Sequence, residues 1–266
     1  MYQSIKLRVK EMIKKLFTIA GLEIHRTLNN RTSDRTPESW GKDGLGKKHQ
    51  RLTPYATYSP WLNDMEFQQT YKHMSTHTLV DLYRCYELWT LARQTANIDG
   101  CVLEVGVWRG GTGALLAMAV KNLPNKKVYL ADTFAGVVKA GINDTCYKGG
   151  EHADTSLEIV NALIVGMSLN NVQLLQGVFP EETQHKIVEN IALLHCDVDV
   201  YSSAKDIVEW SLPRLSPGSI LVFDDYGFSG CEGVTTLCDE LKERKELRFI
   251  YNLNGHAVFV NVGTVK

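Results

Sequence analysis

The chain lacks Cys-x-x-Cys pairs and has no excess of either charge. Its six cysteines are scattered over 266 residues, several of them inside apolar segments. This arrangement favours reduced, buried thiols and argues against a disulfide framework or a zinc site. Lys and Arg number 29 against 30 Asp and Glu, so no global attraction for nucleic acid is expected. These absences are typical of a cytoplasmic protein without a nucleic-acid partner.

The N-terminal segment, "MYQSIKLRVKEMIKKLFTIAGLEIHR" over residues 1–26, predicts an amphipathic basic helix. It is too interrupted by charge for a signal peptide or a membrane-spanning helix. Its apolar stripe could make weak contact with an anionic membrane surface, or pack on the domain or on a neighbouring subunit, and we expect a homo-oligomer. Residues 27–52 are polar and Gly-rich, which predicts a flexible linker or lid. We therefore divide the chain into an extension, 1–52, and a folded domain, 53–266.

The folded domain begins with a helical pattern. Apolar residues recur at three- and four-residue spacing from Leu79 to Trp89, which predicts one amphipathic helix that ends near Asp99 and Gly100. Strands and helices then alternate: strands are predicted near 101–107, 127–134, 172–179, 191–200 and 219–227, and helices near 154–168, 181–190, 203–213 and 231–245. Alternation of this kind predicts an α/β fold with a mostly parallel sheet and helices on both faces.

The end of the chain departs from this alternation. Two apolar runs, "LRFIYN" and "LNGHAVFVNV", are joined by a turn that contains Asn-Gly, which predicts an antiparallel hairpin. A parallel sheet completed by such a hairpin is the Rossmann-like, seven-stranded plan of class I methyltransferases.

A glycine turn follows the first strand. In "LEVGVWRGGTG", Glu104, Gly106 and Gly110 have the E-x-G-x-x-x-G spacing with which class I methyltransferases hold S-adenosylmethionine. The G-x-G-x-x-G fingerprint of dinucleotide sites is not completed, because Leu116 stands at its third glycine. Asp132 ends the next strand, where a carboxylate can bind both ribose hydroxyls.

Two pairs of carboxylates follow the next parallel strands. Asp197 and Asp199 come after the fourth strand, and Asp224 and Asp225 after the fifth. The carboxyl ends of parallel strands share one edge of a sheet, so all four acids should meet in one crevice. Clustered carboxylates raise one another's pKa unless a cation intervenes. A set of oxygen ligands alone indicates Mg²⁺ or a similar hard cation.

The choice of base rests on a comparison with metal-dependent catechol-type methyltransferases. They have an Asp after strand four, an acidic pair after strand five, and a Lys three residues beyond the first Asp. Here Val200 stands at that Lys position, so Asp199 is the nearby base. It would lie on the same side as Asp197 if the chain stays extended.

Longer motifs resemble the macrocin O-methyltransferase family from about residue 59 to the end: "LEVGVWRGGTGALLA", "LADTFAG", "LQGVFPEE", "DVDVYSSAKDIVEWSLPRLSPGSILVFDDYG" and "GCEGV". Members of this family methylate sugar hydroxyls with S-adenosylmethionine and Mg²⁺. The resemblance implies that Asp197, Asp224 and Asp225 hold the metal and that Asp199 is the base. It also implies a cofactor site made of Glu104, Gly106, Thr112, Asp132 and Phe179, the last two on ribose and adenine.

Departures from the family leave the acceptor open. The segment after "DTFAG" reads "VVKAGINDTCYKGGEH", without the proline-containing turn often seen there. The acceptor is therefore expected to be a small molecule or glycan: a sugar of a natural product, a nucleotide sugar or a surface-polysaccharide precursor. Alternatives are a hydroxylase or oxidoreductase on the same sheet, or a non-catalytic module of a polysaccharide assembly. His152 and His256 could be further bases, although lone histidines are more often structural.

Overall fold

A computed structural model describes residues 39–50, 52 and 56–263. The chain separates into two units, Met1–Glu38 and Ser39–Lys266, and every described residue belongs to the second. The helix predicted for residues 1–26 lies outside the described residues. No helix of the described part has both the length and the apolar character needed to cross a membrane.

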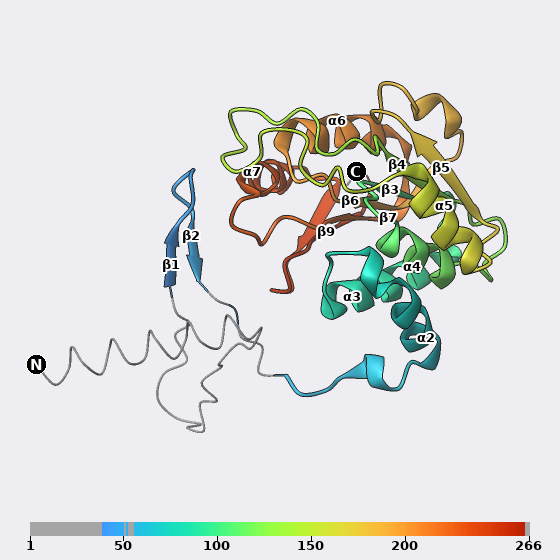
Figure 1. Ribbon diagram of the computed structural model, residues 1–266. Coiled ribbons are helices and arrows are strands. Elements are labelled where there is room, and N and C mark those ends of the chain that lie inside the picture. Colours follow the sequence, from blue (N-terminus) through green and yellow to red (C-terminus); the bar gives the residue numbers. More distant parts are fainter. Residues whose placement is uncertain (1–38, 51, 53–55, 264–266) are drawn as a thin grey trace, which may run out of the picture. The chain divides into compact units, whose positions relative to one another are not determined.

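A seven-stranded sheet forms the centre of the second unit (Figure 1). Its order is β5-β4-β3-β6-β7-β9-β8. The first five strands in this order pair parallel, and β9 pairs antiparallel with both β7 and β8, so β9 alone runs opposite to the other six. The strands are β3 (Cys101–Val105), β4 (Val128–Asp132), β5 (Val172–Gln176), β6 (Ile191–Cys196), β7 (Leu215–Phe223), β8 (Leu247–Ile250) and β9 (Ala257–Asn261). The predicted methyltransferase sheet and its C-terminal hairpin are confirmed.

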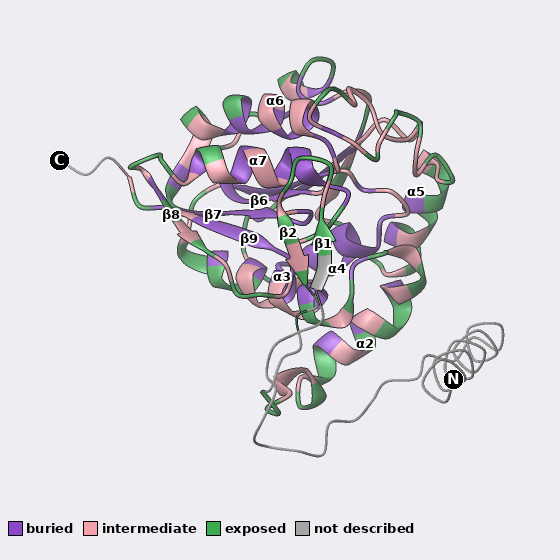
Figure 2. Ribbon diagram, turned by 90° about the vertical axis from the view of Figure 1, so that its left-hand side faces the viewer, coloured by how far each residue is buried: buried purple, intermediate pink, exposed green. Residues whose placement is uncertain are grey.

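Helices cover both faces of this sheet (Figures 1 and 2). One core cluster joins one sheet face to α6 and α7, and the other joins the opposite face to α2, α3, α4 and α5. The helices are α2 (Met65–Met74), α3 (Leu82–Gln94), α4 (Gly111–Ala119), α5 (Leu157–Gly166), α6 (Tyr201–Ser211) and α7 (Glu232–Leu241). Short 3-10 helices occupy Pro60–Leu62, Ser75–His77, Thr95–Asn97, Gln184–Lys186 and Leu212–Arg214.

Two predicted elements differ from the structure. The helix predicted for 181–190 is only the 3-10 turn Gln184–Lys186, because Ile187 then turns into the core and the backbone carbonyl of Asn190 accepts a hydrogen bond from Cys101 in β3. The α3 helix starts later than its apolar pattern suggested. Asp81 caps its first N–H groups, and Leu79 is left exposed before it.

Part of the predicted linker or lid is a β-hairpin. Strands β1 (Ser39–Lys42) and β2 (Lys48–Gln50) pair antiparallel. The Asp43 carboxylate closes the turn between them by accepting hydrogen bonds from the backbone N–H groups of Leu45, at 3.0 Å, and Lys47, at 2.7 Å. Residues 39–50 are therefore ordered by local polar contacts that composition alone did not reveal.

The turn after β3 passes very close to the chain that leaves β6. Gly106 has a left-handed φ of +89°, and a Cβ added there would lie 1.6 Å from the carbonyl oxygen of Asp197. The N–H of Asp197 donates to the carbonyl of Val105 at 2.9 Å. Only glycine fits this position, both for its backbone angle and for its space.

We therefore expect Gly106→Ala to lower the free energy of unfolding by more than about 3 kcal/mol, or to prevent folding, because its Cβ would collide with backbone. Gly166→Ala is the matched control, since no atom lies within 4 Å of a Cβ there and its φ is not in the left-handed region. Urea denaturation measures both variants. Equal midpoints for Gly106→Ala and the wild type would contradict the steric argument.

Candidate active site

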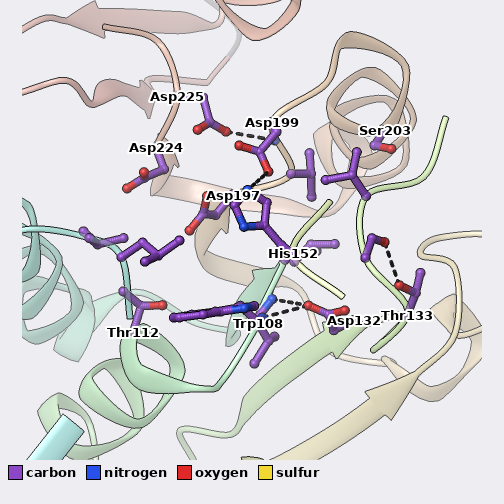
Figure 3. Close-up of a pocket in the computed structure, with 18 of the residues that line it drawn as sticks. Trp108, Thr112, Asp132, Thr133, His152, Asp197, Asp199, Ser203, Asp224 and Asp225 are labelled. Atoms are coloured by element: carbon purple, nitrogen blue, oxygen red, sulfur yellow. Dashed lines mark hydrogen bonds and ion pairs between the residues drawn. The ribbon is translucent and has the colours of Figure 1, made fainter. Parts of the chain in front are cut away.

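A cavity of about 370 Å³ lies at the carboxyl ends of β3, β4, β6 and β7. Figure 3 shows the acidic side chains from β6 and β7 gathered opposite the glycine turn and Asp132. Eight of the ten predicted site residues line this cavity: Gly106, Thr112, Asp132, Phe179, Asp197, Asp199, Asp224 and Asp225. The other two, Glu104 and Gly110, lie behind its wall.

The glycine turn shapes one side of the cavity. Gly110 has a φ of +89° and precedes α4, and a Cβ there would meet Val160 at 2.9 Å. Thr112, in the first turn of α4, is buried and lines the cavity. The N-terminus of α4 is thus at the cavity, where helix N–H groups favour an anionic ligand group such as a carboxylate.

Asp132 both lines the cavity and holds the glycine turn. Its Oδ2 accepts hydrogen bonds from the backbone N–H groups of Val107, at 2.6 Å, and Trp108, at 2.9 Å, and its Oδ1 accepts from Phe134 at 2.7 Å (Figure 3). A carboxylate has about four acceptor positions, so one remains for a ribose hydroxyl. The carboxylate fixes the turn as well as facing the ligand space.

Glu104 has a different place from the one its motif suggests. It is fully buried in β3, and its Oε1 lies 2.8 Å from Nδ1 of the buried His195 in β6. Its Oε2 has no hydrogen-bond partner among the described residues. Glu104 therefore lies in the core beside His195 and does not line the cavity.

The carboxylates of Asp197, Asp224 and Asp225 converge, with one oxygen from each lying within 4.8 Å of the others. Burial raises the pKa of Asp197 well above its usual range, and the charges of Asp224 and Asp225 raise it further. Burial also raises the pKa of Asp225, with Asp199 and Asp224 adding to the effect. A buried, oxygen-only cluster whose charges repel fits a hard divalent cation.

The negative charge of Asp224 is stabilised by neighbouring basic side chains. Although burial acts to raise the pKa of Asp224, His195, His256 and the guanidinium of Arg84 hold it far below its usual range. Nη1 of Arg84 donates to Oδ2, and Nε2 of His256 lies 2.9 Å from Oδ1. Sequence reasoning missed Arg84; its signal was a charged residue inside the apolar stripe of α3.

Asp199 is positioned by a turn and not by an extended strand. Strand β6 ends at Cys196, and Asp199 has a left-handed φ of 63°, so the expected alternation from Asp197 is wrong. The N–H of Asp199 donates to Oδ2 of Asp225 at 3.0 Å, which keeps the two carboxyl groups adjacent (Figure 3). The Tyr147 hydroxyl donates to Oδ1 of Asp199 at 2.5 Å, and Nε2 of His152 lies 3.9 Å from Oδ2.

The loop that carries Tyr147 and His152, residues 133–152, forms another wall of the cavity. It is fastened to α6: the hydroxyl of Ser203 donates to the carbonyl of Val138 at 2.9 Å, and the buried Asp144 accepts from the N–H of Tyr201 at 2.9 Å. Because α6 leads directly from Asp199, these contacts fix the loop relative to the acidic cluster.

The family can now be assigned. A family model described as Macrocin-O-methyltransferase (TylF) matches residues 38–260. The chain belongs to this family. We conclude that it is an S-adenosylmethionine-dependent O-methyltransferase, because the family model and the relatives described below are O-methyltransferases and not oxidoreductases or non-catalytic modules.

Individual relatives agree with this assignment. The chain is 31% identical over 173 residues to mycinamicin III 3''-O-methyltransferase of Micromonospora griseorubida, across 58% of this chain and 67% of that protein. It is 29% identical over 168 residues to 8-demethyl-8-(2,3-dimethoxy-alpha-L-rhamnosyl)-tetracenomycin-C 4'-O-methyltransferase of Streptomyces olivaceus, across 58% and 64%. Among solved structures, the O-methyltransferase NovP shares the fold with a TM-score of 0.60 and 22% identity, across 70% of this chain and 83% of that one.

The raised pKa values of Asp197 and Asp225 predict how stability responds to pH and Mg²⁺. A carboxyl whose folded-state pKa is raised binds more protons in the native state, so without cations stability should fall as pH rises above about 4. Mg²⁺ should reverse this loss at pH 8 and raise Tm by about 5 °C when near-saturating, with a smaller effect at pH 5. Thermal unfolding in EDTA and in Mg²⁺ measures both effects.

The matched control is Asp239→Asn. Asp239 lies on α7 and its carboxylate pairs with Lys242, so Mg²⁺ should still raise the Tm of this variant. In Asp197→Asn, Mg²⁺ should no longer raise Tm. An equal Mg²⁺ shift in Asp197→Asn and the wild type would show that the cation binds elsewhere.

Proposed function

We propose that this enzyme is Mg²⁺-dependent and transfers the methyl group of S-adenosylmethionine to a hydroxyl of a sugar. The observation that carries the proposal is the meeting, in one cavity, of the glycine turn, the convergent carboxylates and the adjacent Asp199. The names of two relatives support the acceptor class, because they describe 3''-O-methylation of mycinamicin III and 4'-O-methylation of a rhamnosyl-bearing tetracenomycin. A natural-product glycoside or a surface-polysaccharide precursor would present such a hydroxyl.

The cofactor would lie along the wall made by the glycine turn, α4 and β4. Gly106, Gly110 and Thr112 shape the turn and the helix start, and Asp132 offers an acceptor for the ribose. Phe179 offers an apolar face for the adenine; it lines the cavity and is held by an edge-on contact with Trp210, with ring centroids 4.8 Å apart. Glu104 would act indirectly, through the strand end that it supports.

The acidic side of the cavity would bind the cation and the acceptor. Asp197, Asp224 and Asp225 would hold Mg²⁺. When bound, that ion supplies positive charge that lowers the pKa of the acceptor hydroxyl. Asp199 takes the hydroxyl proton through its carboxylate, whose Oδ1 already accepts from Tyr147 and whose Oδ2 faces His152. The walls would orient the acceptor hydroxyl relative to the bound cofactor, and orientation alone can account for several kcal/mol of the barrier.

Three sequence predictions concern either residues 1–26 or properties that the described residues of one chain do not show. Homo-oligomer formation, weak membrane contact through residues 1–26 and a cytoplasmic location therefore stay predictions.

The proposed reaction predicts a mass gain of one methylene group on a rhamnoside-bearing acceptor when the protein is incubated with S-adenosylmethionine and Mg²⁺. EDTA should abolish the gain. Calorimetry should show binding of S-adenosylmethionine or its demethylated product and none of NADH, because the glycine spacing does not suit a dinucleotide. Binding of NADH without a response to either sulfur compound would overturn the cofactor assignment.

Substitutions of the two aspartates that follow β6 should have different effects on turnover and on Mg²⁺ affinity. Asp199→Asn keeps size and hydrogen bonding but removes the proton acceptor, so turnover should fall by roughly 10² to 10⁴ with Mg²⁺ affinity nearly unchanged. Asp197→Asn should weaken Mg²⁺ binding, and added metal should partly restore its activity. A Mg²⁺ titration of both variants at saturating cofactor makes the comparison. If the two phenotypes are exchanged, the assigned roles are exchanged as well.

A further inference from the structure

Asp224 stands apart from the other carboxylates of the acidic cluster, because both of its oxygens lie against nitrogen atoms of basic side chains. Nη1 of Arg84, in α3, donates to Oδ2 of Asp224. Nε2 of His256, the residue directly before β9, lies 2.9 Å from Oδ1 of Asp224. Asp225, by contrast, accepts from the N–H of Asp199 at 3.0 Å and from the thiol of Cys231 at 3.7 Å, neither of which carries positive charge. The pKa values of Asp225 and Asp197 are both raised by burial and by the neighbouring carboxylates. Positive charge from the protein is thus concentrated on one of the three carboxylates.

Arg84 is itself buried and fixed. It is 6% exposed, its guanidinium lies 4.5 Å from the centre of the Phe228 ring, and its Nε donates to Oδ2 of Asp81 at 2.8 Å. The Asp81 side chain is 46% exposed, so water screens that charge, whereas Asp224 is 5% exposed. The charge of Arg84 therefore acts mainly on the acidic cluster, whose cavity Arg84 also lines.

We propose that Arg84 is a selectivity-determining residue: its fixed positive charge beside Asp224 limits the attraction of the acidic cluster for cations and keeps the site suited to divalent rather than trivalent ions. The inference rests on the proposed Mg²⁺ site. Its physical basis is that a fixed positive charge repels an ion in proportion to the charge of that ion. A trivalent ion, which three uncompensated carboxylates would attract most, is penalised more than a divalent one.

Arg84 is not needed to hold Asp224 in position, because other residues do so. His256 holds the other oxygen of Asp224 and is held in turn by Glu87, with its Nδ1 2.7 Å from Oε2 of Glu87. Asn254 donates to the same Glu87 oxygen at 2.7 Å. Asp224 is therefore positioned without Arg84, and removing the guanidinium should change the charge of the site more than its shape.

The test is calorimetric titration of the full chain with Mg²⁺ and with Tb³⁺, which needs no acceptor and no turnover. In Arg84→Met, Mg²⁺ should bind about 10-fold more tightly, and Tb³⁺ should gain by a larger factor, so that the preference shifts toward Tb³⁺. Arg93→Met is the matched control. Arg93 lies on the same helix, pairs with Glu66 at the surface and should leave both affinities unchanged.

Each outcome decides the proposal. If Arg84→Met weakens both ions alike, Arg84 only holds Asp224 in place, and if it changes neither, its charge does not reach the site; both results overturn the inference. If the wild type binds neither ion, the proposed Mg²⁺ site fails and the inference fails with it. Should Arg84→Met not fold, Arg84→Lys keeps the charge and must retain wild-type preference; a shift toward Tb³⁺ in that variant would overturn the inference.

Discussion

The active site depends on the close backbone approach between Gly106 and Asp197. The turn after β3 shapes one wall of the cavity and the segment after β6 carries Asp197 and Asp199, and the two meet where a single Cβ would collide with a carbonyl oxygen. Because β3 and β6 are neighbours in the sheet, this contact sets the spacing between the glycine turn and the carboxylates that follow β6. Glycine at this position thus serves the geometry of the whole cavity and not only a tight turn.

Helix α3 connects this edge of the sheet to the C-terminal hairpin. Arg84 and Glu87 lie one helical turn apart, and both reach Asp224, one directly and the other through His256. Residues 252–256, which connect β8 to β9, are tied to the same helix through Glu87. The antiparallel end of the sheet therefore contributes to the electrostatics of the site, although its strands lie outside the parallel part that carries the acidic side chains.

Sequence patterns predicted the architecture well because alternation and strand composition are local signals. The five parallel strands, the glycine turn and the hairpin all appeared where their residues indicated. The turn at Asp199 could not be predicted, since its N–H binds the carboxylate of Asp225, which is distant in the sequence, and no local pattern marks the left-handed backbone there. Arg84 was missed for the same reason: its partner, Asp224, is 140 residues away. Long-range polar contacts leave little trace in periodicity.

The way in which loop 133–152 is attached determines which residues around the cavity can change without moving the carboxylates. Its anchors, Ser203 and the N–H of Tyr201, belong to α6, whereas Asp224 and Asp225 follow β7. Apart from Tyr147 and His152, which lie against Asp199, and the buried Asp144, which accepts from the N–H of Tyr201, the loop side chains can vary without disturbing the strand ends that carry the carboxylates. The loop and the strand ends are thus held by different elements, so substitutions in the loop can reshape one wall of the cavity while the carboxylates stay in place.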